Sequence, residues 1–241
     1  MTLKLQEIDT NKDFPAIARC MIESYEKPDQ PLIQIWFPIH GDGPEAREDS
    51  IREAADRLKR WHNEDPTSRW HKIVDEKTGK LAGGALWSIY STNPFANHKP
   101  PQAPWFPDDG SREYAEQALM THVTPRSRRA RRAHIYLFLI FTHPDYRRQG
   151  VGQQVMNWGK RKADELGLEI FLDATEVGRP LYEANEFVPI KENPNHPQKE
   201  NPDEKWKELE KKVGPFSLCF MWRPVGGTYE EGKTIKPQEE E

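Results

Sequence analysis

The chain has 241 residues, of which 35% are hydrophobic, so it can bury one sizeable core without requiring a second domain. Its 35 basic and 39 acidic residues give a net charge of −4, which excludes the global positive field typical of nucleic-acid-binding proteins. No apolar run has membrane-spanning length, and the first residues lack the apolar segment of a signal peptide. Cys20 and Cys219 each lie in an apolar pattern typical of buried thiols. We therefore expect a cytoplasmic protein that binds neither nucleic acid nor membrane.

The first ninety residues carry helix and strand patterns in turn. Apolar residues recur with a helical period after Asp13 and again after Pro44, and two strand-like runs flank a turn at 75–80. Gly83 and Gly84, inside the second of these runs, predict a bulge or a close approach of the backbone. The segments expected here are a strand at 3–8, a helix at 14–25, a loop at 28–43, a helix at 44–61, and strands at 70–74 and 81–90.

Residues 92–132 form an insertion that is rich in proline yet carries large aromatic side chains, with a short helix expected at 111–123. The tripeptide Trp-Phe-Pro occurs at 36–38 and again at 105–107, so the insertion is either a lid over a shared cavity or a surface-packed loop. Five arginines follow, for which a solvated loop is favoured over an anion-binding or nucleic-acid-binding patch. They are Arg126, Arg128, Arg129, Arg131 and Arg132.

The most informative stretch runs from His134 to Gly152. Its first nine residues, up to Thr142, are almost all apolar, which predicts a strand buried on both faces. A turn with Gly150 and Gly152 follows, and apolar residues then recur with a helical period up to Gly167. The first turn of a helix has unpartnered N–H groups and the positive end of the helix dipole. This strand–turn–helix unit, with two arginines in the turn, therefore predicts a diphosphate-binding site.

The C-terminal part predicts three further strands and a second insertion. Residues 191–213 are polar and contain a charged, solvent-facing helix that starts at Asn201 or Pro202. Residues 226–241 are polar and acidic, and we expect this tail to be disordered. The strands are expected at 169–175, 188–191 and 216–222.

Three segments resemble the GCN5-related N-acetyltransferase (GNAT) superfamily. Arg147–Gly152 matches its acyl-CoA signature, Arg/Gln-x-x-Gly-x-Gly/Ala, and residues 169–175 resemble its fifth strand. Leu181–Phe187 resembles the Leu-Tyr-x-x-x-Gly-Phe segment that follows, with Glu186 in place of the glycine. P-loops and dinucleotide-binding folds also use glycine-rich turns, but this chain lacks the Gly-Lys-Ser/Thr and the acidic residue that those folds need.

The resemblance implies an α+β GNAT fold over residues 1–225, a mixed α/β arrangement with a twisted, mostly antiparallel sheet of about seven strands flanked by helices and interrupted by two insertions. It also implies acetyl-CoA as co-substrate, without a metal. Tyr182 falls where the family has a tyrosine near the thioester sulfur, and a phenol with a pKa of about 10 stays protonated at neutral pH, so it is the expected general acid. The implied acetyl-CoA contacts are Ile140, Phe141, Thr142, Arg147, Arg148, Gln149, Gly150, Val151, Gly152, Gln153 and Thr175.

The general base is left open by the sequence. Many relatives carry a catalytic glutamate on the central strand, but no carboxylate lies between His134 and Thr142, and Tyr136 stands in its place. His134 is one candidate because a histidine titrates near neutral pH, and Asp173 on the next strand is another. A water relay, or an amine that is already neutral on binding, would need neither residue.

Two functions of different class are consistent with these features. The first is direct transfer of an acetyl group from acetyl-CoA to the primary amine of a small, in particular an aromatic, molecule, because the bulky loops suit an enclosed apolar pocket. A protein or peptide acceptor is its nearest variant. The second is a non-catalytic acyl-CoA-binding or regulatory domain. In either case we expect a monomer or a homodimer. The candidate substrate contacts, which ordinary core aromatics would also explain, are Trp36, Phe37, Trp105 and Tyr136.

Overall fold

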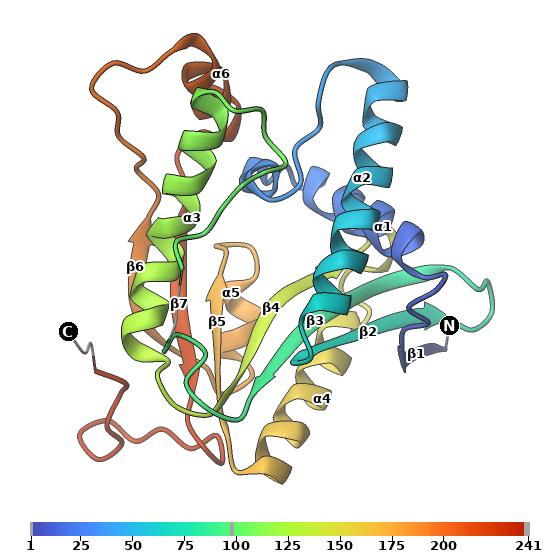
Figure 1. The fold of residues 1–241 in the computed structure, drawn as a ribbon. Helices are drawn as coiled ribbons and strands as arrows, with labels where there is room; N and C mark the ends of the chain where they lie inside the picture. The colour runs from blue at the N-terminus through green and yellow to red at the C-terminus, as the bar shows by residue number, and fades with distance from the viewer. Residues whose placement is uncertain (1, 97–98, 239–241) are drawn as a thin grey trace.

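The protein is built on a seven-stranded sheet (Figure 1). The computed structural model describes residues 2–96 and 99–238, so residues 1, 97–98 and 239–241 lie outside the description. The strand order is β1-β2-β3-β4-β5-β7-β6, and only β4 and β5 pair in parallel. The strands are β1 (Leu3–Glu7), β2 (Ser68–Asp75), β3 (Leu81–Tyr90), β4 (His134–Thr142), β5 (Glu169–Ala174), β6 (Val188–Pro194) and β7 (Ser217–Arg223). This confirms the predicted α+β class with a mostly antiparallel sheet flanked by helices.

Helices cover both faces of the sheet (Figure 1). On one face α4 lies so close to β3 that a Cβ on Gly159 would be 2.3 Å from the indole of Trp87. On the other face α1 and α2 bury apolar side chains, and Phe14 meets Trp70 edge to face at 5.9 Å. The helices are α1 (Phe14–Glu26), η1 (Pro31–Ile35), α2 (Gly43–Glu64), α3 (Gly110–Arg129), η2 (Pro144–Tyr146), α4 (Val151–Leu166), α5 (Arg179–Glu183) and α6 (Glu204–Val213).

Strands β4 and β5 pair at one end of the sheet only. Their register couples His134–Leu137 to Glu169–Leu172 and stops there. On the other side of β4, Leu86 pairs with Leu139 and Trp87 with Leu137, so Phe138 is an extra residue that forms a bulge. A bulge bends its strand and increases the local twist. Beyond Leu137, β4 therefore diverges from β5 and leaves an opening between the two strands (Figure 1).

The glycines of β3 bring the start of α4 against the sheet. A Cβ on Gly83 would lie 2.5 Å from the carbonyl oxygen of Phe141 and 2.7 Å from Cγ1 of Val151. A Cβ on Gly84 would lie 2.8 Å from the ring of Phe141. The predicted close approach of the backbone is confirmed, and it fixes the first turn of α4 beside the end of β4.

Helix α3 is longer than the helix predicted at 111–123, because it continues through Pro125 to Arg129. The first part of the basic run is therefore helical, and the solvated-loop interpretation is wrong for Arg126. Its side chain is 15% exposed and forms an ion pair with Asp173. Residues Ala115, Leu119 and Arg126 are spaced by four and seven positions, so they lie on one face of the helix, and this face turns inward.

Helix α6 was predicted to be a solvent-facing element of the second insertion, and this prediction is wrong. Trp206, Leu209 and Val213 are buried against α3, and the ring of Trp206 meets that of Tyr114 edge to face at 5.2 Å. The two insertions therefore pack on each other and share a core of their own. Strand β6 also extends three residues beyond the predicted end at Lys191.

The C-terminal segment begins with a contact to the sheet, because the ring of Tyr229 lies 6.4 Å from that of Trp222. Disorder in the tail stays a prediction, and its last residues, 239–241, lie outside the description. Within residues 2–96 and 99–238, no helix has the length and apolar character needed to cross a membrane.

The packing of α6 gives a testable prediction. Trp206→Ala removes a side chain that is 1% exposed and leaves a cavity between α3 and α6, so we expect the free energy of unfolding to fall by about 3–5 kcal/mol. Glu208→Ala, on the exposed face of the same helix, should change it by less than about 0.5 kcal/mol. Urea unfolding of both variants measures the difference. Equal, small losses would mean that α6 is only a surface addition.

Candidate active site

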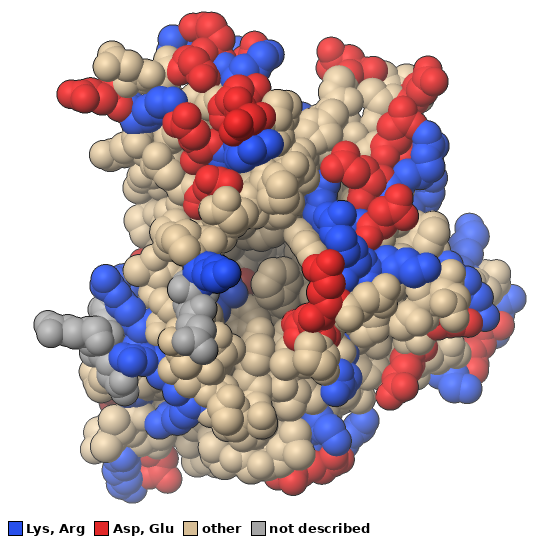
Figure 2. All heavy atoms as spheres, viewed as in Figure 1, with Lys and Arg blue, Asp and Glu red and all other residues tan. Residues whose placement is uncertain are grey.

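Two cavities meet at the opening between β4 and β5. One is a cleft of about 670 Å³ that extends from the end of β4 to the first turn of α4. The other is a pocket of about 350 Å³ between α1, α2, α3 and the sheet. The hollowed face in Figure 2 is lined mainly by uncharged atoms, with acidic and basic side chains on its rim. The two cavities share five lining residues, which are Tyr25, Phe138, Leu139, Asp173 and Thr175.

The first turn of α4 forms one end of the cleft. Gly150, with φ +86°, and Arg148, with φ +59°, adopt left-handed backbone conformations that turn the chain from β4 into the helix. The N–H groups of Val151, Gly152 and Gln153 have no acceptor within the part of the chain that the structure describes, as is usual for a first helical turn. This end of the cleft therefore combines free amide donors, a positive dipole and two arginines.

The cleft brings together nearly all the residues that the sequence predicted for acetyl-CoA. The exception is Gln149, whose side-chain amide turns away and donates to the carbonyl oxygen of Asp145 at 2.8 Å. The predicted residues that line the cleft are Ile140, Phe141, Thr142, Arg147, Arg148, Gly150, Val151, Gly152, Gln153 and Thr175.

The diverging part of β4 forms the long wall of the cleft. Its edge no longer pairs with β5 beyond Leu137, so main-chain groups of this segment face the cleft. Tyr25 of α1 crosses the opening, and its hydroxyl donates to the carbonyl oxygen of Ile140 at 3.4 Å. The guanidinium of Arg147 donates to the carbonyl oxygen of Ser24 at 2.6 Å, which ties the turn to the end of α1.

Tyr182 of α5 lies in the cleft and is 5% exposed. Burial raises the pKa of its phenol above the ordinary value of 10, and the neighbouring Tyr25 adds to this shift. The ring packs against Phe187 at 6.0 Å, and its hydroxyl has no hydrogen-bond partner among the described residues. Tyr182 is thus a protonated phenol that is free to donate into the cleft.

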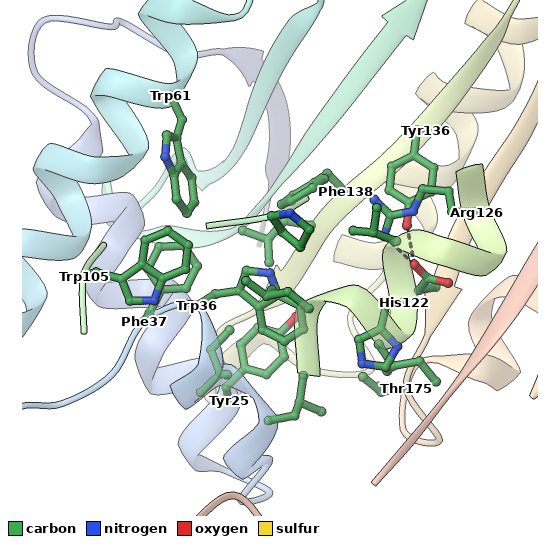
Figure 3. Close-up of a pocket in the computed structure, with 18 of the residues that line it drawn as sticks. Tyr25, Trp36, Phe37, Trp61, Trp105, His122, Arg126, Tyr136, Phe138 and Thr175 are labelled. Carbon is green, nitrogen blue, oxygen red and sulfur yellow. Dashed lines mark hydrogen bonds and ion pairs between the residues drawn. The ribbon is translucent and has the colours of Figure 1, made fainter. Parts of the chain in front are cut away.

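Aromatic side chains form a large part of the pocket (Figure 3). The four predicted substrate contacts, Trp36, Phe37, Trp105 and Tyr136, all line it. Trp105 of the first insertion donates its indole N–H to the carbonyl oxygen of Ile35 at 2.9 Å, so the insertion closes over the pocket. Four further aromatic residues line the pocket that the sequence pattern did not indicate as pocket residues, namely Tyr25, Trp61, His122 and Phe138.

One wall of the pocket is polar. Asp173 Oδ2 accepts hydrogen bonds from Arg126 and from the Tyr136 hydroxyl, both at 2.6 Å, and the Arg126 guanidinium lies 4.1 Å from the centre of the Tyr136 ring. Burial raises the pKa of Tyr136 well above its ordinary value, so its hydroxyl keeps its proton. Next to this cluster, His122 is 1% exposed and stacks on Trp36 at 6.3 Å.

The two base candidates from the sequence lie in different places. Asp173 lines both cavities, whereas His134 lines neither. The His134 ring is buried between Tyr90 and Phe171, and its Nδ1 is 2.7 Å from the carbonyl oxygen of Arg132. Burial also lowers the pKa of His134, and its buried ring lies in the core outside both cavities.

Comparison with known families supports this picture. The sequence model described as the acetyltransferase (GNAT) family matches residues 30–187. The chain belongs to this family. Its members are N-acetyltransferases that use acetyl-CoA, which confirms the resemblance noted in the sequence. No curated protein matches the sequence.

Solved structures of N-acetyltransferases share the fold. A histone acetyltransferase HPA2-related protein from Corynebacterium glutamicum is 19% identical, with a TM-score of 0.55 over 93% of this chain and 97% of that one. Arylalkylamine N-acetyltransferase 2 from Aedes aegypti is 13% identical, with a TM-score of 0.56 over 93% and 100%. The Drosophila melanogaster polyamine N-acetyltransferase is 12% identical, with a TM-score of 0.56 over 92% and 99%.

The buried His122 predicts an acid-dependent loss of stability. Burial lowers its pKa from 6.5 to about 4, opposed by the charge of Asp173 and assisted by that of Arg126. Between these two pKa values the unfolded chain binds more protons than the folded one, so stability falls as the pH drops from 6.5 toward 4. From pH 7 to pH 5 the contribution of this group amounts to about 2 kcal/mol.

The measurement is urea unfolding at pH 7 and at pH 5. His122→Phe keeps the ring between Trp36 and Phe216 and removes the titrating group, so this variant should lose about 2 kcal/mol less than the natural protein over the interval. The same loss in both proteins would show that His122 does not titrate in this range.

Proposed function

We propose that this protein transfers an acetyl group from acetyl-CoA to the primary amine of a small molecule, in particular an aromatic one, in a ternary complex. The observation that carries the proposal is the continuity of the two cavities. A cleft with free helix amides at one end joins an aromatic pocket at a junction lined by Tyr25, Asp173 and Thr175. Co-substrate and acceptor would then meet at this junction without a covalent enzyme intermediate.

The residues of the cleft fit acetyl-CoA. The unpartnered N–H groups of Val151, Gly152 and Gln153 would hold the diphosphate, with Arg147 and Arg148 adding charge. The unpaired edge of β4 from residue 138 to 142 would offer main-chain hydrogen bonds to the pantetheine arm. Bound in this way, acetyl-CoA would supply an activated acyl group as a thioester.

The chemistry needs an uncharged amine nucleophile and a donor for the departing thiolate. Tyr182 would be this donor, because burial keeps its phenol protonated and its hydroxyl is free. A nitrogen that attacks the thioester carbonyl carbon forms the C–N bond, the C–S bond breaks, and the thiolate takes the phenolic proton. Water in the cleft would accept the proton released by the amine nitrogen and pass a proton to the phenolate, which restores the phenol.

The enclosed pocket favours a small acceptor over a peptide. Trp36 and Trp105 come from the two Trp-Phe-Pro segments, and both face the same space (Figure 3). The indole N–H of Trp105 is bonded to the backbone at Ile35, so this wall is fixed across the pocket. Solved structures that share the fold include enzymes whose names give arylalkylamines and polyamines as acceptors, which are small amines.

The test is Tyr182→Phe. We expect kcat for thiol release from acetyl-CoA to fall by a factor of about 10² or more, the range that a positioned general acid contributes, with little change in the KM for acetyl-CoA. Tyr114→Phe is the matched control, because this buried tyrosine packs on Trp206 and lines neither cavity, and it should leave kcat unchanged.

A second function has one observation in its favour, since Tyr136 stands where many relatives carry a catalytic glutamate. A non-catalytic acyl-CoA-binding domain would bind coenzyme A in calorimetry but release no thiol with any amine. That result in the natural protein would contradict the proposed transfer reaction. Absence of coenzyme A binding would contradict both functions.

A further inference from the structure

The polar wall of the pocket holds buried atoms that lack partners. Both ring nitrogens of His122 and the Oδ1 atom of Asp173 are buried and have no hydrogen-bond partner within the described residues. The two side chains are 1% and 7% exposed. Leaving buried polar atoms unsatisfied is costly, and proteins seldom do so without a reason. Because both residues line the pocket, a ligand is the natural partner for these atoms.

The carboxylate of Asp173 is held in one orientation. Its Oδ2 atom accepts from Arg126 on one side and from Tyr136 on the other, each at 2.6 Å (Figure 3). These two donors come from α3 and β4, so the carboxylate is clamped between the first insertion and the sheet. Its other oxygen, Oδ1, is thereby fixed as a free acceptor that a ligand can meet without reorganising the wall.

The chemistry of the free atoms selects the ligand group. Asp173 Oδ1 only accepts hydrogen bonds, and a neutral imidazole offers one acceptor and one donor nitrogen. Arg126 Nε is a further buried donor without a partner within the described residues. A primary ammonium supplies several N–H donors and a positive charge, which matches the two free acceptors on Asp173 and His122. A ligand carboxylate would be repelled by Asp173, and the positive charge of Arg126 is already paired with Asp173.

The position of Asp173 agrees with this choice. Asp173 and Thr175 line both the pocket and the cleft, whereas His122 and Arg126 line the pocket only. A nitrogen bound at Asp173 therefore lies at the junction, where the acceptor must meet the thioester. The rest of the acceptor would extend into the pocket.

The remainder of the pocket accepts an apolar body and no second cation. Apart from Asp173, its lining residues within the described part of the chain include no carboxylate, and four large aromatic side chains form the far side. The Arg57 guanidinium already stacks on Phe37 and Trp105, so a second ammonium buried there would lose its hydration beside an existing cation and without a carboxylate, which is strongly unfavourable. The four aromatic residues are Trp36, Phe37, Trp61 and Trp105.

We propose that Asp173, clamped by Arg126 and Tyr136, binds the ammonium group of the acceptor, and that the site selects primary monoamines with an aryl or alkyl body over diamines and amino acids. The inference rests on the proposed transfer reaction, of which it names the substrate class. Asp173 acts here as a specificity-determining residue that recognises the form in which such amines exist in neutral solution. The bound ammonium would pass one proton to water in the cleft before its nitrogen attacks the thioester, because the transfer needs an uncharged amine.

The experiment is calorimetric binding in the presence of coenzyme A, which does not depend on turnover. Hexylamine, 1,6-diaminohexane and 1-hexanol share a six-carbon body and differ in charge. We expect hexylamine to bind at least about 30-fold more tightly than the diamine and the alcohol, the range typical of a buried charge that lacks its partner. Phenethylamine should likewise bind more tightly than phenylalanine by at least about 30-fold.

Asp173→Asn should weaken the binding of hexylamine by at least about 30-fold and leave the binding of coenzyme A unchanged. Asp108→Asn, on the exposed surface, should change the binding of neither ligand. Equal binding of hexylamine and the diamine, or unchanged binding of hexylamine in Asp173→Asn, would overturn the inference. The comparison of ligands on the natural protein stands even if Asp173→Asn does not fold. Tight, selective binding of hexylamine without thiol release would contradict the proposed reaction and leave the amine site supported.

Discussion

Two parallel strands share hydrogen bonds only while they stay at ladder spacing, and β4 and β5 do so for four residue pairs, ending at Leu137 and Leu172. The extra residue at Phe138 then bends β4, and its edge is left without a strand partner. Both cavities open at this point, one on each side of the junction. The cleft needs the unpaired edge of β4, and the pocket needs the exposed face of Phe138. The separation of these two strands is therefore the constraint on which the whole site depends.

The position of the first insertion depends on an ion pair that joins it to the sheet. Burying Arg126 and Asp173 costs desolvation energy, which their hydrogen bonds and the contact with Tyr136 offset. Because Arg126 belongs to α3 and Asp173 to β5, the pair also fixes the insertion relative to the sheet. Helix α6 supports α3 from the outside through Trp206, so an element far from the cavities helps to hold the pocket in shape.

The sequence predicted best what depends on neighbouring residues. The strand, turn and helix at 134–167 are specified locally by an apolar run, by the glycines at 150 and 152 and by a helical period after them. The structure contains this unit, and a cleft lies where the strand meets the helix. The sequence predicted less well what depends on distant partners. Trp206, Leu209 and Val213 recur at the spacing of an amphipathic helix, but the sequence does not show that α3 lies against this face. Arg126 is one of five arginines in the basic run. What distinguishes it from the others is that it follows Leu119 by seven residues and so lies on the same inward face of α3.

The sequence by itself determined the class of fold, the glycine turn that opens α4 and the candidate acid Tyr182, because each of these follows from short-range periodicity or from a motif of a few residues. The tertiary structure decided which aromatic segments share a pocket, which arginine is buried, and that Asp173 rather than His134 lines the two cavities. Those decisions depend on the crossing of α3 over the sheet and on the divergence of β4 from β5. Such long-range contacts join residues tens of positions apart, and no local pattern records them.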